Sequence, residues 1–159
     1  MNSKKSILFV CTANQCRSPM AEALMKDHLK RMGLQEKVLV SSAGTWAEDG
    51  HPATAFGIKA MAERGLNTSF HRSQALTQEL MEQFDLVLTM ETGHKEAIQI
   101  EFPMYADKVF MLSEMSSQIK NIEDPIGGSF EDYLETAREI DEWIKTGFKH
   151  IIKLLQLEA

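Results

Sequence analysis

The chain has 159 residues, of which 43% are hydrophobic and 25% charged, a composition typical of one soluble domain with a real core. Its formal net charge of -6 argues against nucleic acid or an anionic membrane surface as the main partner, because binding to either needs a basic face. The two cysteines, Cys11 and Cys16, would close too small a loop to staple a secreted scaffold, and the apolar run at 7–10 is too short for a signal-peptide core or membrane span. We therefore expect one cytoplasmic domain over residues 1–159.

Apolar stretches alternate with helical patterns along the chain. The first stretch is a short continuous apolar run of the kind that is buried on both faces of a parallel sheet. Strands separated by helices imply right-handed crossovers, so the sequence predicts an α/β fold with a four-stranded parallel sheet and helices on both faces. In chain order we expect a strand at 6–10, a helix at 18–32, a strand at 38–40, helices at 52–64 and 78–83, a strand at 84–90, a helix at 91–100, a strand at 109–112 and a long helix from residue 130.

Two of these helices carry clear end signals. Ser18 can cap the helix at 18–32, Pro19 suits the first helical position, and Gly33 ends it. In the last helix, apolar residues recur at spacings of three and four, which indicates one buried face. We expect Thr146 and Gly147 to break that helix.

The segment between the first strand and the first helix carries the strongest chemical signal. Cys11 is followed, after five residues, by Arg17 and a hydroxyl residue. Such a connection can turn backbone N–H groups inward to bind an oxyanion, with help from the helix dipole, while a guanidinium grips two phosphate oxygens. The same field is expected to lower the pKa of the Cys11 thiol from about 8.5 into the ~3.5–7.5 range. Cys11 is thus a predicted nucleophile, although a lone cysteine after a strand is often only a small buried residue. The predicted phosphate-binding loop is Thr12, Ala13, Asn14, Gln15, Cys16, Arg17 and Ser18.

No cofactor and no metal are expected. The loop lacks the Gly-Lys-Ser/Thr sequence of nucleotide-binding loops. The five histidines are scattered without ligand spacing, and the two cysteines match no zinc pattern.

A covalent phosphoenzyme also needs a group that protonates the leaving group and then activates water, and one carboxylate can do both. The strongest loop signal in the second half is the sequence from Glu123 to Gly128, where a proline and two glycines fix a turn. Asp124 is the predicted general acid and base, and Glu123 is the alternative. An Asp-Pro pair can also be only a turn.

Cys11 to Pro19, together with Asp124 and Pro125, resembles the low-molecular-weight protein tyrosine phosphatase family over almost the whole chain. The segments 41–45, 71–73 and 84–90 come in the family's order and at about its distances. The resemblance implies a four-stranded parallel sheet, Cys11 as nucleophile, Arg17 as phosphate ligand and Asp124 as general acid and base. It also implies supporting roles for Asn14, Ser18, Ser42 and His71.

These supporting roles have a physical rationale. Asparagine tolerates the left-handed backbone of a tight anion loop, and Ser42 and His71 are expected to hold its side chain. Ser18 can donate to the Cys11 sulfur and ease its departure, or serve only as a helix cap. Cys16 matches the family's second loop cysteine, placed to form a reversible disulfide with Cys11 under peroxide, unless it merely packs.

Several positions depart from the family. Where many members carry aromatic residues after Asp-Pro, this chain has Ile126 and Gly127, and the expected pocket wall is Gln15, Trp46 and Ile126. Gln15 is neither the isoleucine common in tyrosine phosphatases nor the threonine of the arginine-phosphatase branch. Gln74 and Glu91 stand where many relatives have arginine and aspartate.

The predicted function is therefore phosphomonoester hydrolysis on phosphorylated protein substrates by a monomer or weak dimer, with phosphotyrosine as the first substrate and phosphoarginine as the alternative. Arsenate reduction is less favoured, because a cysteine relay needs a third cysteine that this chain lacks. A binding module without catalysis is opposed by the retention of Cys11, Arg17 and Asp124 together.

Overall fold

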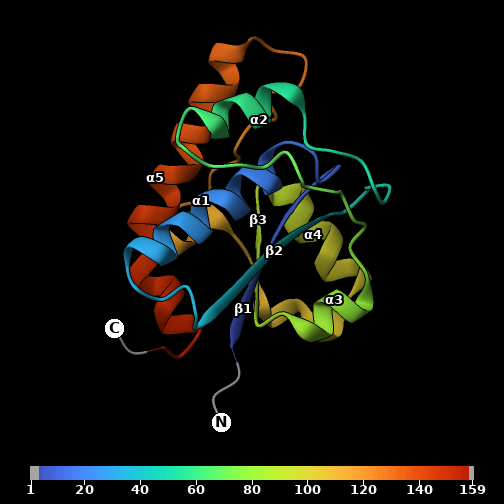
Figure 1. Cartoon of the computed structure of the whole chain (residues 1–159). Coiled ribbons are helices and arrows are strands. Elements are labelled where there is room, and N and C mark those ends of the chain that lie inside the picture. Colours follow the sequence, from blue (N-terminus) through green and yellow to red (C-terminus); the bar gives the residue numbers. More distant parts are fainter. Residues whose placement is uncertain (1–3, 158–159) are drawn as a thin grey trace.

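The computed structural model describes residues 4–157. Its centre is a parallel four-stranded sheet in the order β2-β1-β3-β4 (Figure 1). The predicted α/β fold with one parallel sheet is thereby confirmed, while residues 1–3 and 158–159 of the predicted 1–159 domain lie outside the described residues. The strands are β1 (Lys5–Cys11), β2 (Val38–Gly44), β3 (Leu86–Thr89) and β4 (Val109–Met111).

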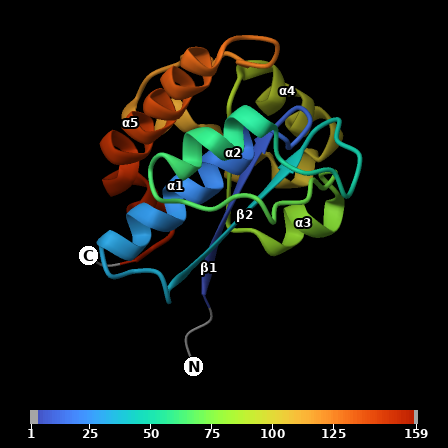
Figure 2. The ribbon, with the colours of Figure 1, turned by 45° about the horizontal axis from the view of Figure 1, so that its top comes forward.

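Helices cover both faces of the sheet, as predicted (Figures 1 and 2). Alternate residues of β1 point to opposite faces, so Ile7 and Phe9 enter one core and Leu8 and Val10 enter the other. The first core lies under α1 (Arg17–Arg31), α2 (Ala55–Ala62), α5 (Phe130–Leu154) and the short helix η2 (Leu112–Ser116). The second lies under α3 (Gln78–Gln83), α4 (Thr92–Glu101) and η1 (Pro103–Lys108).

The start of α1 and the middle of α5 differ from the sequence prediction. Helix α1 begins at Arg17, and its N-cap is Cys16, which makes no side-chain cap bond. The prediction that Ser18 caps this helix was wrong, because its hydroxyl is used by the neighbouring loop. The expected break at Thr146 and Gly147 was also wrong, since α5 is continuous there.

The reason for Gly147 is the packing of α5 against η2. A Cβ atom at this position would lie 2.6 Å from the Met115 Cβ and 3.2 Å from the Met115 main-chain carbon. The glycine is therefore a close-approach residue rather than a helix breaker. The Thr146 hydroxyl is satisfied within the helix by donating to the Glu142 carbonyl at 3.0 Å.

No helix within residues 4–157 combines the length and the apolar character needed to cross a bilayer. In the same part of the chain, no three His, Cys, Asp or Glu side chains come together as a metal-binding group.

Candidate active site

The site lies at the carboxyl ends of β1 and β2, where ligands bind in open parallel sheets. Cys11 is the last residue of β1 and pairs with Gly44, the last residue of β2. Residues 12–16 form the connection from β1 to α1. The spacing of Cys11 and Arg17 thus reflects one short loop that joins a buried strand to a helix N-terminus.

Neighbouring segments hold the carbonyl groups of this loop on its outer side. Four successive or nearly successive carbonyls accept hydrogen bonds from three different segments. The Cys11 carbonyl accepts from the Thr45 N–H and the Thr12 carbonyl from the Trp46 N–H, both at 2.9 Å. The Asn14 carbonyl accepts from the His71 ring at 2.7 Å, and the Gln15 carbonyl accepts from the Thr54 N–H at 2.9 Å.

The N–H groups of the loop point the other way. Within residues 4–157, no main-chain N–H of residues 12–16 donates to a protein acceptor. Asn14 has a positive φ of 57°, a left-handed conformation that turns successive N–H groups toward a common centre. The N-terminus of α1 adds its positive dipole end. The loop is therefore built to bind an oxyanion.

Asn14 is the fully buried brace of this loop. Its side-chain nitrogen donates to the Ser18 hydroxyl at 2.8 Å, and its side-chain oxygen accepts the Gln74 N–H at 3.0 Å. His71 reaches the Asn14 carbonyl rather than the side chain.

The prediction that Ser42 holds the Asn14 side chain was wrong. The Ser42 hydroxyl donates instead to the carboxylate of Glu22 on α1, at 2.7 Å. At the site, the Ser42 carbonyl accepts a hydrogen bond from the Gln74 side chain at 2.9 Å. The bond to the Asn14 side chain comes instead from the main-chain N–H of Gln74, a residue that the sequence marked only as a departure from relatives.

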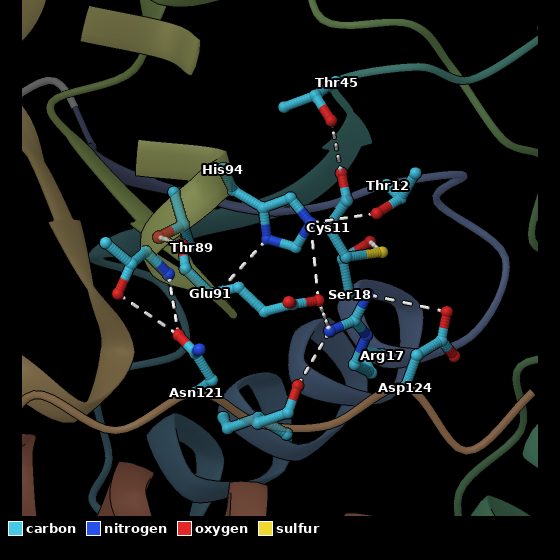
Figure 3. Close-up of polar contacts among 12 residues, drawn as sticks. Cys11, Thr12, Arg17, Ser18, Thr45, Thr89, Glu91, His94, Asn121 and Asp124 are labelled. Atoms are coloured by element: carbon cyan, nitrogen blue, oxygen red, sulfur yellow. Dashed lines mark hydrogen bonds and ion pairs between the residues drawn. The ribbon is translucent and has the colours of Figure 1, made fainter. Parts of the chain in front are cut away.

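Cys11 is 2% exposed, and its sulfur lies 3.0 Å from the Ser18 hydroxyl oxygen (Figure 3). Because Ser18 already accepts from Asn14, its own proton can point toward the sulfur, which is nearer than the second acceptor, the Ala43 carbonyl at 3.5 Å. This geometry suits a thiolate, which accepts such a bond both before attack and when it leaves phosphorus.

Arg17 is almost fully buried, and its guanidinium is held in a fixed orientation (Figure 3). One terminal nitrogen, Nη1, pairs with the Glu91 carboxylate and donates to the Ile122 carbonyl at 2.7 Å. The Nε atom is buried without a partner among the described residues. A buried unpaired donor is costly, so this N–H is one that a bound phosphate oxygen would satisfy.

Asp124 stands at the mouth of the site. One carboxylate oxygen is 3.6 Å from Arg17 Nη2, and the other accepts the Ile126 N–H at 3.1 Å, which fixes the turn. The segment before it is tied to the residue that follows β3, because the Ile122 N–H donates to the Met90 carbonyl at 2.9 Å. The alternative acid, Glu123, is exposed and makes no ion pair with Arg17 among the described residues.

Cys16 is buried at the start of α1 and is a free thiol, as is Cys11. Burial, followed by the nearby charges of Asp124 and Cys11, raises the pKa of Cys16 to about 12. Cys16 is therefore held as a protonated thiol at neutral pH, unlike an activated nucleophile.

The residues expected to form the pocket wall are less buried. Trp46 is 86% exposed and Ile126 is 59% exposed, whereas Gln15 is half-buried in the loop itself. Ile126 and Asp124 also line an open groove between the Asp-Pro turn and α5. The wall assignment for Gln15, Trp46 and Ile126 stays a prediction.

Sequence reasoning missed one buried polar group, His94. This residue is 6% exposed and lies beside Glu91 at the start of α4. Its ring contacts the Thr12 hydroxyl at 2.9 Å and the Glu91 N–H at 3.1 Å. The spacing of Glu91 and His94, as N-cap and third helical residue, was the signal that could have placed them together.

A nucleophilic thiol at the end of a parallel strand, an inward ring of N–H groups, a buried arginine and a nearby carboxylate define a cysteine-dependent phosphatase site. The chain belongs to the low molecular weight phosphotyrosine protein phosphatase family, whose model matches residues 6–157. The resemblance drawn from the sequence is thereby confirmed.

Individual relatives cover nearly the whole chain. A protein-arginine-phosphatase of Bacillus subtilis (strain 168) is 43% identical over 92% of this chain and 97% of its own length. A probable low molecular weight protein-tyrosine-phosphatase, EpsP of Ralstonia nicotianae, is 40% identical over 88% of this chain and 94% of its own. Among solved structures, a cysteine-to-serine mutant of YwlE arginine phosphatase with a phosphorylated active-site serine superposes with a TM-score of 0.87, at 42% identity over 93% of this chain and 95% of that one.

Proposed function

We propose that this chain is a cytoplasmic protein tyrosine phosphatase, a single phosphatase domain over residues 1–159 that works through a phosphocysteine on Cys11. The observation that carries the proposal is the loop of residues 12–16 beside the Cys11 thiol, whose N–H groups have no protein acceptor within residues 4–157. The buried Arg17 Nε without a partner supports the same conclusion. Phosphorylated proteins are the proposed substrates and a monomer or weak dimer the proposed state.

In the first step, the Cys11 thiolate attacks phosphorus, so that an S–P bond forms while the P–O bond to the tyrosine oxygen breaks. Asp124 gives its proton to that oxygen, which leaves as a neutral phenol. The loop N–H groups and the Arg17 guanidinium stabilise the equatorial oxygens of the transferring phosphoryl group.

In the second step, the Asp124 carboxylate takes a proton from water, whose oxygen attacks phosphorus. The S–P bond breaks, inorganic phosphate forms, and Cys11 leaves as a thiolate that accepts the Ser18 hydroxyl proton in a hydrogen bond. The phosphorylated active-site serine of the YwlE mutant supports a covalent phosphoenzyme at this loop position.

Phosphoarginine is a second candidate substrate, favoured by the 43% identity to the Bacillus subtilis protein-arginine-phosphatase. The reaction would break a P–N bond, with Asp124 as the same proton donor. The similar identity to EpsP, 40%, keeps phosphotyrosine as the main proposal.

Steady-state rates on phosphotyrosine and phosphoarginine peptides, measured side by side with acid-quench trapping of phosphocysteine, test the proposal. Cys11→Ser is expected to abolish turnover while still binding inorganic phosphate, because the cradle is mostly backbone. Cys16→Ser is its matched control. Turnover of Cys11→Ser within about tenfold of the parent would exclude the covalent route.

Arg17→Lys removes the planar fork and is expected to lower kcat by about 10²–10³-fold, the usual loss for one oxyanion donor. The control is Arg31→Lys at the exposed end of the same helix, where the side chain pairs only with Asp27 among the described residues. A loss in Arg17→Lys no larger than in Arg31→Lys would mean that Arg17 has only a structural role.

A further inference from the structure

We infer that His94 is a positioning residue, a neutral imidazole that ties Thr12 of the phosphate loop to the turn that holds Glu91 against Arg17. This inference rests on the proposed phosphatase function, because it assigns His94 a part in that reaction without any contact with the phosphate.

The two ring contacts of His94 fix its tautomer (Figure 3). The Nδ1 atom faces the Glu91 N–H at 3.1 Å, so it must act as an acceptor without a proton. A neutral ring then carries its proton on Nε2, which donates to the Thr12 hydroxyl oxygen at 2.9 Å. Both ring nitrogens are thus hydrogen-bonded, Nδ1 as an acceptor and Nε2 as a donor.

Burial favours the neutral form of the ring, and the charges that surround it act in both directions. Arg17 faces it from α1, Glu91 from the start of α4 and Asp124 from the turn before α5. Burial, and then the Arg17 charge, lower the pKa of His94 to about 4 against the opposite effect of the two carboxylates. Glu91 lies 3.9 Å from Nε2 but is directly paired with Arg17.

Protonation or loss of the ring would therefore disturb both partners. An imidazolium would present an N–H to the Glu91 N–H and would compete with Arg17 for the Glu91 carboxylate. In the neutral state, Glu91 remains available to orient the Arg17 guanidinium through Nη1, while Nε keeps no partner among the described residues.

Thr12 is the other end of the link. It directly follows Cys11, and its carbonyl is already held by the Trp46 N–H at 2.9 Å. The bond from His94 holds its side chain as well, so the first residue of the loop is fixed at two points. A single side chain on α4 thus braces both ends of the loop, the nucleophile end through Thr12 and the arginine end through Glu91.

Three variants separate these contacts. In His94→Asn the short amide can still accept the Glu91 N–H but does not reach Thr12, while in His94→Gln the longer amide can donate to Thr12. Thr12→Val removes the acceptor. We expect His94→Asn and Thr12→Val each to lower kcat about three- to tenfold, the kinetic value of one neutral hydrogen bond, with little change in the affinity for inorganic phosphate.

The double variant is the decisive measurement. If one hydrogen bond carries both effects, His94→Asn combined with Thr12→Val loses no more than either alone, and His94→Gln recovers part of the loss. His150→Asn, an exposed histidine on α5, is the control and should retain parental rates. Ring ¹⁵N spectra of the parent should show the Nε2–H tautomer of His94 at neutral pH.

Additive losses in the double variant, or a His94 ring with its proton on Nδ1, would overturn the inference while leaving the phosphatase function intact. A parent enzyme that hydrolyses neither an aryl phosphate nor either phosphopeptide would overturn the proposed function, and the role of His94 with it.

Discussion

Gly44 lies beside the nucleophile, and a methyl group there would meet the phosphate loop. A Cβ at this position would lie 2.4 Å from the Thr12 carbonyl oxygen and 3.0 Å from the Asn14 main-chain nitrogen. Opening the first contact to the 3.0 Å that real Cβ atoms tolerate requires a shift of about 0.6 Å. Gly44 itself is held in β2, because its N–H donates to the Gln74 carbonyl at 3.0 Å and its carbonyl accepts from the Leu76 N–H at 2.9 Å. We therefore expect the loop, rather than the strand, to move.

Gly44→Ala is therefore expected to lower kcat/KM by about ten- to a hundredfold, because a misplacement near 1 Å costs about 10²-fold. Overpacking should also lower the free energy of unfolding by about 1–3 kcal/mol. Kinetics on an aryl phosphate and urea unfolding measure the two effects. Gly93→Ala is the control, since nothing lies within 4 Å of a Cβ there. Parental kinetics in Gly44→Ala would refute the view that this contact sets the position of the loop.

Three further predictions concern other parts of the molecule. Asp124→Asn should slow substrates with poor leaving groups far more than those with good ones, and equal losses across leaving groups would speak against an acid role. Cys16→Ala should convert reversible inactivation by peroxide into irreversible loss, and an intact mass of the oxidised parent without a loss of about 2 Da would end that idea. Because burial raises the pKa of Cys16 to about 12, the disulfide with Cys11 should form faster at higher pH. Gly147→Ala should destabilise the fold in urea by about 1–2 kcal/mol through contact with Met115, despite a better helix propensity, and unchanged stability would contradict this packing.

The apolar runs predicted every strand of the sheet, but not where each one ends. Strand β2 continues past Val40 to Gly44, because Ser41 and Ser42 pair with Leu8 and Phe9 of β1 despite their polarity. Main-chain hydrogen bonds to the neighbouring strand can extend a strand through polar residues, and such an extension does not appear in the pattern of apolar residues. Strand β4, predicted at 109–112, ends one residue earlier, at Met111. The apolar Leu112 continues the hydrophobic run but already begins the short 3-10 helix η2.

The phosphate loop was predictable because all its parts lie within eight residues, from Cys11 to Ser18. Its support was not, because the supporting groups come from distant segments. Glu91 and His94 reach the loop across more than 70 positions of sequence, and no local pattern encodes that contact. Ser42 was misassigned because sequence order does not determine which way a hydroxyl points, and here it points to Glu22.

The buried imidazole of His94 should also make the fold sensitive to acid in a defined range. Its pKa is about 4 in the folded protein and 6.5 ordinarily, so between these values the unfolded chain binds the extra proton more readily. The free energy of unfolding should therefore fall as the pH drops below about 6.5, and this loss should be complete below about pH 4, at about 3 kcal/mol. Other groups also titrate there, so the measured quantity is the difference between the parent and His94→Asn, in which they cancel. A difference that stays constant from about pH 7.5 to about pH 4 would mean that the ring is protonated as readily in the folded protein as in the unfolded chain.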